Sequence, residues 1–230
     1  MEIRVLADAD AVAAEAARVI AAEARAAVAA RGRFVMAVSG GRTPWRMLRA
    51  LGDEDVPWAG VRVVQVDERV APPGDPDRNL THLRESLLER APLPADHIHA
   101  MPVEDDDLAT AATRYAETLE EIAGAPAVLD LAHLGLGPDG HTASLVPGDP
   151  VLDVTDRDVA LTGVYMARRR MTLTYPILDR SRRILWVVTG AEKAAMLPRL
   201  RAADGSIPAG RVRQEQALIL ADRAAVGGQG

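Results

Sequence analysis

The chain has 230 residues, a formal net charge of -6 and no cysteine, and only 3% of its residues are aromatic although 48% are hydrophobic. The missing cysteine excludes disulfides, thiolate chemistry and cysteine-ligated zinc. The acidic balance, with no basic block longer than Arg168–Arg170, argues against a nucleic-acid partner. No apolar run approaches the ~20 residues of a membrane span and no signal peptide is evident, so we expect a cytoplasmic protein without a membrane partner.

Apolar runs alternate with helical segments along the whole chain. Asp8 or Asp10 is suited to begin the first helix, Gly32 to end it, and Asn79 to cap a later one. This alternation predicts an α/β fold with a doubly wound, mostly parallel sheet and helices on both faces. We expect one domain over residues 1–226 and a disordered tail over residues 227–230. The predicted strands are 3–6, 34–41, 61–66, 127–137, 171–174, 184–189 and 217–222, and the predicted helices are 8–32, 43–51, 79–90, 106–123 and 190–200.

Three predicted strands end in polar or glycine-rich loops. These loops are SGGRTP (Ser39–Pro44), DER (Asp67–Arg69) and GLGPDGH (Gly135–His141). The carboxyl ends of parallel strands share one edge of a sheet, and ligands of α/β proteins bind there. We therefore expect a ligand site formed by these loops.

The SGGRTP loop has the features of an anion site. Its glycines and the following helix start leave backbone N–H groups free for a phosphate, and Arg42 adds positive charge. Ser39 and Thr43 add hydroxyl groups, and Pro44 suits a first helical turn. The spacing matches neither a Walker loop nor a dinucleotide fingerprint, and the same residues also suit an ordinary strand-to-helix turn.

The GPDGH segment places a rare histidine in a tight turn. Gly140 permits the turn, and a carboxylate can orient His141 for proton transfer near neutral pH. The TASL residues that follow predict a helical turn whose N-terminus would keep His141 neutral. His133 lies inside an apolar strand and is expected to pack in the core. No acidic cluster accompanies the other histidines, so we expect no metal site.

Taken in order, SGGRTP, DER, GLGPDGHTASLVPG, RMTLT and VVTGAEKA resemble the 6-phosphogluconolactonases over nearly the whole chain. The resemblance implies the fold shared with glucosamine-6-phosphate deaminase and ribose-5-phosphate isomerase. It implies hydrolysis of 6-phospho-D-glucono-1,5-lactone to 6-phosphogluconate, the second step of the oxidative pentose phosphate pathway. A small sugar phosphate is then the partner, no cofactor is required, and the chain is expected to be a monomer or a small homo-oligomer.

The resemblance also implies roles for individual residues. His141 matches the general base that activates water, Asp139 matches its motif aspartate, and Asp67 and Arg69 line the same pocket. Either carboxylate is a candidate to orient His141. The resemblance implies that residues of the SGGRTP loop and two basic residues from other motifs bind the substrate or its phosphate, and Arg42 is a further cationic candidate in that loop. The full set is Ser39, Gly40, Gly41, Arg42, Thr43, Arg170 and Lys193. The main phosphate ligand stays open among Arg42, Arg69, Arg170 and Arg182.

Two departures from the family pattern bear on alternative functions. The family often has Phe where this chain has Val146, and many members have Ser where it has Arg78. Glucosamine-6-phosphate deaminases carry a glutamate at the position of Val146, which assists ring opening, so a deaminase is less favoured than a lactonase. A sugar-phosphate sensor of a transcriptional regulator is also less favoured, because no helix-turn-helix segment precedes the first strand and both Asp139 and His141 are present.

Overall fold

The computed structural model describes residues 1–227 and is built around a seven-stranded sheet in the order β1-β10-β9-β6-β2-β3-β5. Every neighbouring pair in this sheet is parallel, as the sequence predicted. The strands are β1 (Glu2–Leu6), β2 (Phe34–Val38), β3 (Val61–Gln65), β5 (Ile98–His99), β6 (Leu131–Leu134), β9 (Ile184–Val188) and β10 (Ala217–Asp222). The helices are α1 (Ala9–Arg31), α2 (Arg42–Gly52), α3 (Asn79–Leu83), α4 (Leu108–Ala123), α5 (Tyr175–Arg180), α6 (Leu197–Arg201) and α7 (Pro208–Arg211).

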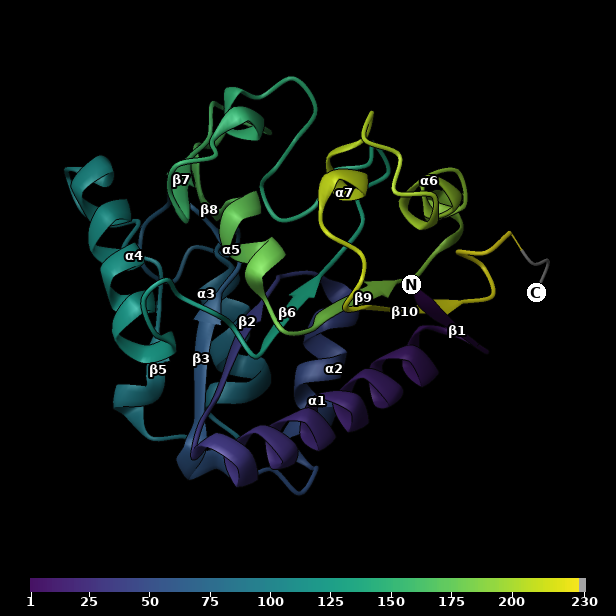
Figure 1. Cartoon of the computed structure of the whole chain (residues 1–230), viewed down its shortest axis with the longest axis horizontal. Helices are drawn as coiled ribbons and strands as arrows, with labels where there is room; N and C mark the ends of the chain where they lie inside the picture. Colours follow the sequence, from purple (N-terminus) through teal and green to yellow (C-terminus); the bar gives the residue numbers. More distant parts are fainter. Residues whose placement is uncertain (228–230) are drawn as a thin grey trace.

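Strand β2 shows why the central strands read as continuous apolar runs. All five of its residues are buried. Phe34, Met36 and Val38 belong to a hydrophobic cluster that includes α1 and α2, whereas Val35 and Ala37 belong to a second cluster. Alternate side chains point to opposite faces of a strand, so both faces of the sheet are covered. Figure 1 shows α1 and α2 together on one side of the sheet and α5 and α7 on the other.

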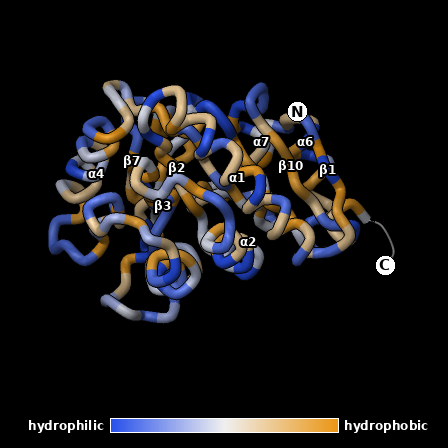
Figure 2. The backbone as a smooth tube through the Cα atoms, turned by 90° about the horizontal axis from the view of Figure 1, so that it is seen from below, coloured by the Kyte–Doolittle hydropathy of each residue, from blue (hydrophilic) through white to orange (hydrophobic). Residues whose placement is uncertain are grey.

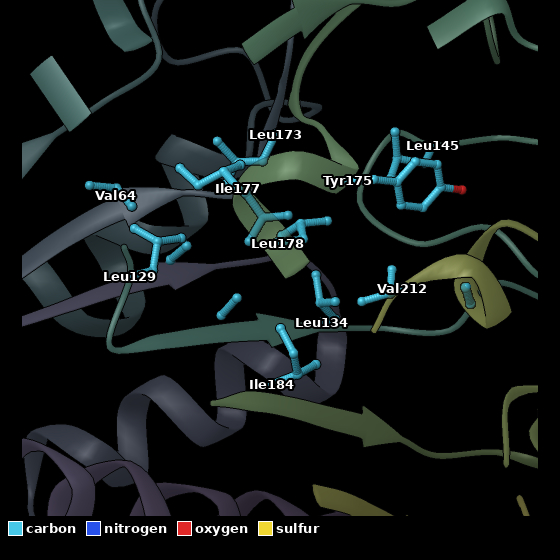
Figure 3. Close-up of a cluster of buried hydrophobic side chains, with 14 of the residues drawn as sticks. Val64, Leu129, Leu134, Leu145, Leu173, Tyr175, Ile177, Leu178, Ile184 and Val212 are labelled. Atoms are coloured by element: carbon cyan, nitrogen blue, oxygen red, sulfur yellow. The ribbon is translucent and has the colours of Figure 1, made fainter. Parts of the chain in front are cut away.

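The second cluster seats α5 on the sheet. Ile177 and Leu178 of α5 are fully buried and lie over Val64, Leu134 and Ile184 of three parallel strands (Figure 3). Hydrophobic residues run along inner strands such as β10, whereas many outer loops are hydrophilic (Figure 2). None of the helices in residues 1–227 is long and apolar enough to cross a membrane.

The ends of α1 follow from their capping residues. The Asp8 side chain accepts a hydrogen bond from the Ala11 backbone N–H at 2.8 Å, which satisfies one of the free donors of the first turn. Gly32 ends the helix in the left-handed conformation at φ 73°, where a residue without a Cβ is least strained. Both ends agree with the sequence prediction.

A second, three-stranded sheet departs from the expected architecture. DER forms β4 (Asp67–Arg69), which pairs antiparallel with β8 (Arg170–Leu173), and β8 pairs antiparallel with β7 (Val159–Leu161). The strand predicted at 171–174 therefore exists but lies outside the parallel sheet. This pairing sets Arg69 directly opposite Arg170.

Three local predictions were wrong or incomplete. The predicted helix 79–90 is split into α3 and a π-helical segment, Arg84–Leu88, and its N-cap is Arg78 rather than Asn79. The helix predicted over 190–200 is interrupted after a short 3₁₀ turn, Ala191–Lys193. No helix begins at Thr142. Instead, Thr142 and Leu145 form an isolated bridge around Ala143, whose φ of 51° is left-handed.

The proposed chain end is only partly described. Gly227 lies in a turn, and its backbone N–H donates to the Ala224 carbonyl at 3.2 Å; the disordered tail over residues 227–230 stays a prediction. The rest of the predicted tail, 228–230, lies outside the described residues. The single domain over residues 1–226 stays a prediction.

His133 in β6 is a core residue, as expected. It is fully buried, and its Nδ1 accepts a hydrogen bond from the Ser39 backbone N–H at 3.2 Å. Burial lowers the pKa of His133 from 6.5 to about 4. The imidazole is therefore neutral in the folded protein and fixes the start of the Ser39 loop.

This shift makes the folded state sensitive to acid. The unfolded chain binds more protons at His133 than the folded chain between about pH 6.5 and about pH 4, so stability is lost as the pH falls through that window. His133→Gln keeps an acceptor for Ser39 but does not titrate. Between about pH 7 and about pH 5, urea unfolding of the wild type should lose about 2 kcal/mol more than the variant loses. Equal losses in both proteins would contradict a neutral, buried His133.

Candidate active site

A polar cavity of about 180 Å³ lies at the carboxyl edge of the parallel sheet, next to the small sheet. The loops after β2 and β6 supply one part of its lining, and β4 and β8 supply another. The sequence-predicted residues that line it are Ser39, Gly40, Asp67, Arg69, His141, Arg170 and Lys193. The expected convergence of the three loops is therefore observed.

Asp139, not Asp67, contacts the histidine. Asp139 Oδ1 lies 2.6 Å from His141 Nδ1 and accepts the His141 backbone N–H at 3.1 Å. Burial opposes ionisation of Asp139, but the hydrogen bonds and the charge interaction with His141 outweigh it, so the pKa of Asp139 is below its ordinary value. An ionised carboxylate only accepts hydrogen bonds, so Nδ1 carries a proton, and in the neutral form of the ring the lone pair is on Nε2.

The turn that carries His141 depends on two glycines. The Gly137 N–H donates to the His141 carbonyl at 2.8 Å, and the Gly140 N–H donates to the Gly137 carbonyl at 3.0 Å. Gly140 has φ 85°, and a Cβ there would lie 2.7 Å from Ile207. A Cβ at Gly137 would lie 2.1 Å from His141 Nδ1. The imidazole therefore occupies the space that a side chain at Gly137 would need.

Asp67 forms hydrogen bonds with other residues of the cavity wall and not with His141. Its Oδ2 accepts the Ser144 hydroxyl at 2.6 Å, and its Oδ1 lies 3.4 Å from Asn79 Nδ2. Asn79 also accepts a hydrogen bond from Arg69 Nη1 at 2.7 Å. Ser144 and Asn79 are thus site residues that the sequence analysis did not assign. Asn79 follows the long polar loop after DER, which was the available signal, whereas Ser144 gave none.

Two guanidinium groups make the cavity electropositive. Arg69 and Arg170 face each other across β4 and β8. Among the described residues, Nε of each is buried without a hydrogen-bond partner. Burial, and then the charge of Arg69, lower the pKa of Arg170 below its ordinary value, although a guanidinium stays protonated in proteins. An anion between them would relieve both the desolvation and the repulsion.

The rest of the SGGRTP loop opens into an adjoining cavity of about 440 Å³. Gly41, Arg42 and Thr43 line this second cavity and not the first, and Thr43 Oγ1 lies 2.7 Å from Thr189 Oγ1. Gly40 and Lys193 line both cavities. The predicted binding residues therefore fall into two connected groups.

Arg182 lies apart from these groups. It is more than half exposed and 3.5 Å from Asp130, and it precedes β9 at the amino edge of the sheet. We therefore discard it as a phosphate candidate. No three His, Asp or Glu side chains of residues 1–227 are grouped so as to hold a metal ion.

A parallel, doubly wound sheet with a polar cavity at its carboxyl edge defines an α/β protein that binds a small ligand at that edge. The family described as glucosamine-6-phosphate isomerases/6-phosphogluconolactonase matches residues 7–220, and the chain belongs to this family.

Individual relatives cover nearly the whole chain. A Mycobacterium tuberculosis protein named 6-phosphogluconolactonase is 36% identical over 235 residues, which cover 96% of this chain and 95% of the relative. The crystal structure of 6-phosphogluconolactonase from Thermotoga maritima is 27% identical with a TM-score of 0.84 and covers 96% of this chain and 98% of its own. A monomeric glucosamine-6-phosphate deaminase has a TM-score of 0.86 and covers 100% of both chains, but its 18% identity shows the fold alone.

The packing of Gly137 against the imidazole is directly testable. Gly137→Ala should displace the His141 ring, because the added Cβ would meet Nδ1 at 2.1 Å. A crystal structure of the variant should show Nδ1 more than about 3.5 Å from Asp139 Oδ1, beyond hydrogen-bond range. Gly205→Ala, whose Cβ would have nothing within 4 Å, is the matched control. An unmoved imidazole in Gly137→Ala would contradict this account of the turn.

Proposed function

We propose that this protein hydrolyses 6-phospho-D-glucono-1,5-lactone to 6-phospho-D-gluconate in the pentose phosphate pathway. The observation that carries the proposal is the Asp139–His141 pair in a cavity that also presents two guanidinium groups. A sugar-phosphate lactone needs both a base for water and a cationic place for its phosphate. Relatives at 33–36% identity over most of this chain carry the name of this enzyme.

The proposed reaction uses water and no covalent intermediate. His141 Nε2 takes a proton from a water molecule, whose oxygen forms a bond to the lactone carbonyl carbon. The carbon–ring-oxygen bond then breaks, and the imidazolium returns the proton to the leaving ring oxygen. Asp139 holds Nδ1–H and stabilises the imidazolium. A positioned general base supplies about 10²–10⁴-fold in rate, which suits an ester that is already activated.

The serines near the cavity support water as the nucleophile. The Ser39 hydroxyl donates to the His133 carbonyl at 2.9 Å, and the Ser144 hydroxyl donates to Asp67 at 2.6 Å. A nucleophilic serine needs its hydroxyl within reach of a base such as histidine. Both hydroxyls are instead engaged by oxygen acceptors in the wall.

For substrate binding, we propose that Arg170 is the main phosphate ligand, with Arg69 beside it. Their unpaired, buried Nε groups support this assignment. Ser39 and Gly40 would contact the sugar, and Lys193 would lie between the two cavities. Gly41, Arg42 and Thr43 would contact the part of the substrate that extends into the adjoining cavity.

A deaminase reaction is disfavoured by Val146. This side chain is buried and carries no carboxyl group to assist ring opening. The described cavity residues at this turn provide one acid–base group, His141, with Asp139 behind it. Hydrolysis needs no further proton donor, so the observed set suits the lactonase.

Removing the imidazole should remove the catalysed rate. We expect His141→Ala to lower kcat/KM for fresh 6-phosphogluconolactone by about 10²–10⁴-fold, the contribution of a general base. The assay follows acid release after subtraction of the spontaneous rate, and thermal unfolding verifies that the variant is folded. A wild-type protein without excess rate would refute the function, whereas a fully active His141→Ala would refute only the role of His141.

Phosphate recognition can be separated from catalysis by comparing two lactones. Arg170→Ala should raise KM for the phosphorylated lactone by at least about 10-fold, since a charge-assisted hydrogen bond contributes about 1.5–3 kcal/mol. KM for unphosphorylated gluconolactone should change far less. Arg182→Ala removes an exposed guanidinium at the other edge of the sheet and should change neither. Equal effects of Arg170→Ala on both substrates would exclude this arginine as the phosphate ligand.

A further inference from the structure

Tyr165 contacts three residues of the candidate active site, although no sequence motif singles it out. It lies in the hairpin between β7 and β8 and is one of three tyrosines in the chain. Its neighbours are Asp139, His141 and Arg170. The proton-transfer pair and the proposed phosphate ligand therefore touch the same side chain.

The hydroxyl of Tyr165 engages the free oxygen of Asp139. Tyr165 Oη donates to Asp139 Oδ2 at 3.4 Å, while Asp139 Oδ1 is used by His141. Burial, and then the Asp139 carboxylate, raise the pKa of Tyr165 above its ordinary value, so the phenol stays protonated and acts as a donor. Two donors thus hold the two oxygens of one carboxylate and fix its rotation.

The ring of Tyr165 links the pair to the cationic side of the cavity. It stands edge-on to the His141 imidazole, with ring centroids 5.8 Å apart and an interplanar angle of 65°. The Arg170 guanidinium carbon lies 5.0 Å from the ring centroid. These are the ranges of aromatic edge contacts and of cation–π attraction.

The hairpin that carries this tyrosine has a strained backbone. Met166 and Ala167 both have left-handed φ values, 49° and 63°, which cost energy in residues with a Cβ. The Tyr165 N–H donates to the Arg168 carbonyl at 2.9 Å and closes the turn. Val164 and Met166 are 71% and 75% exposed, so the hairpin directs its tyrosine inward and leaves its apolar neighbours in solvent.

We propose that Tyr165 is a positioning residue of the lactonase site: its hydroxyl fixes Asp139 against His141, and its ring holds Arg170. This inference rests on the proposed function. It predicts that loss of the hydroxyl affects turnover and that loss of the ring also affects substrate binding.

The test is a double-mutant cycle with Asp139. Tyr165→Phe should lower kcat about 3- to 10-fold with KM unchanged, as expected for one long hydrogen bond to a charged group. In the Asp139→Asn background the same change should have little further effect, because the coupled partner has been altered. Tyr165→Leu should in addition raise KM for the phosphorylated lactone. Val164→Ser, on the same hairpin and exposed, should leave both constants unchanged.

Three results would overturn the inference. An unchanged kcat in Tyr165→Phe, or an equal loss in both Asp139 backgrounds, would show that the hydroxyl does not act through Asp139. Wild-type protein without lactonase activity would instead refute the proposed function. In that event the ¹⁵N signals of the His141 ring still decide the question: Tyr165→Phe should increase the population protonated on Nε2 and Val164→Ser should not, and identical tautomer populations would refute the positioning role.

Discussion

The wall of the cavity depends on one carboxylate that is removed from solvent. Glu68 is fully buried, and its oxygens accept the backbone N–H groups of Arg69, Asn79 and Leu80 at 2.7 to 2.8 Å. The Gln65 amide donates to it at 2.8 Å, and Arg78 Nε lies 3.5 Å away. A buried charge is costly unless it is paired and hydrogen-bonded. These partners therefore converge on Glu68, and their convergence joins the small strand β4 to the start of α3.

This junction accounts for the electrostatics of the cavity. Glu68 holds β4 in place beside Asn79. The Asn79 side chain accepts a hydrogen bond from Arg69 Nη1 and donates one to the Asp67 carbonyl at 2.9 Å. These bonds fix the Arg69 side chain on the strand position opposite Arg170. The chain as a whole carries a net charge of -6, yet among residues 1–227 the cavity is lined by Arg69, Arg170 and Lys193 against a single carboxylate, Asp67. A net acidic protein can thus contain a cavity with more cationic than anionic groups, because the local geometry and not the total charge sets the potential inside a cavity.

Much of this arrangement was predictable from the sequence, and the exceptions share a cause. The alternating apolar runs gave the parallel sheet, and the rule that loops after parallel strands share an edge brought Ser39, Asp67 and His141 together. The second sheet escaped prediction because Asp67–Arg69 and Arg170–Leu173 are far apart in the chain, and short strands carry little periodic signal. The proposed role of Tyr165 could not be predicted for the same reason. Its contacts with Asp139 and His141 are with residues that lie distant in the chain, and no pattern in the surrounding residues marks a ring that faces the candidate site. The choice between Asp67 and Asp139 was likewise decided by distances that no spacing rule provides.

The site therefore has two halves that are built by different means. The His141 half is local: a turn closed by backbone hydrogen bonds, with Gly137 leaving room for the imidazole and Asp139 two residues away. The arginine half is non-local, because it requires β4 and β8 to pair outside the parallel sheet. The hairpin that carries Tyr165 contacts both halves. A parallel sheet alone would have presented a histidine at its edge, and the small antiparallel sheet adds two guanidinium groups beside that histidine.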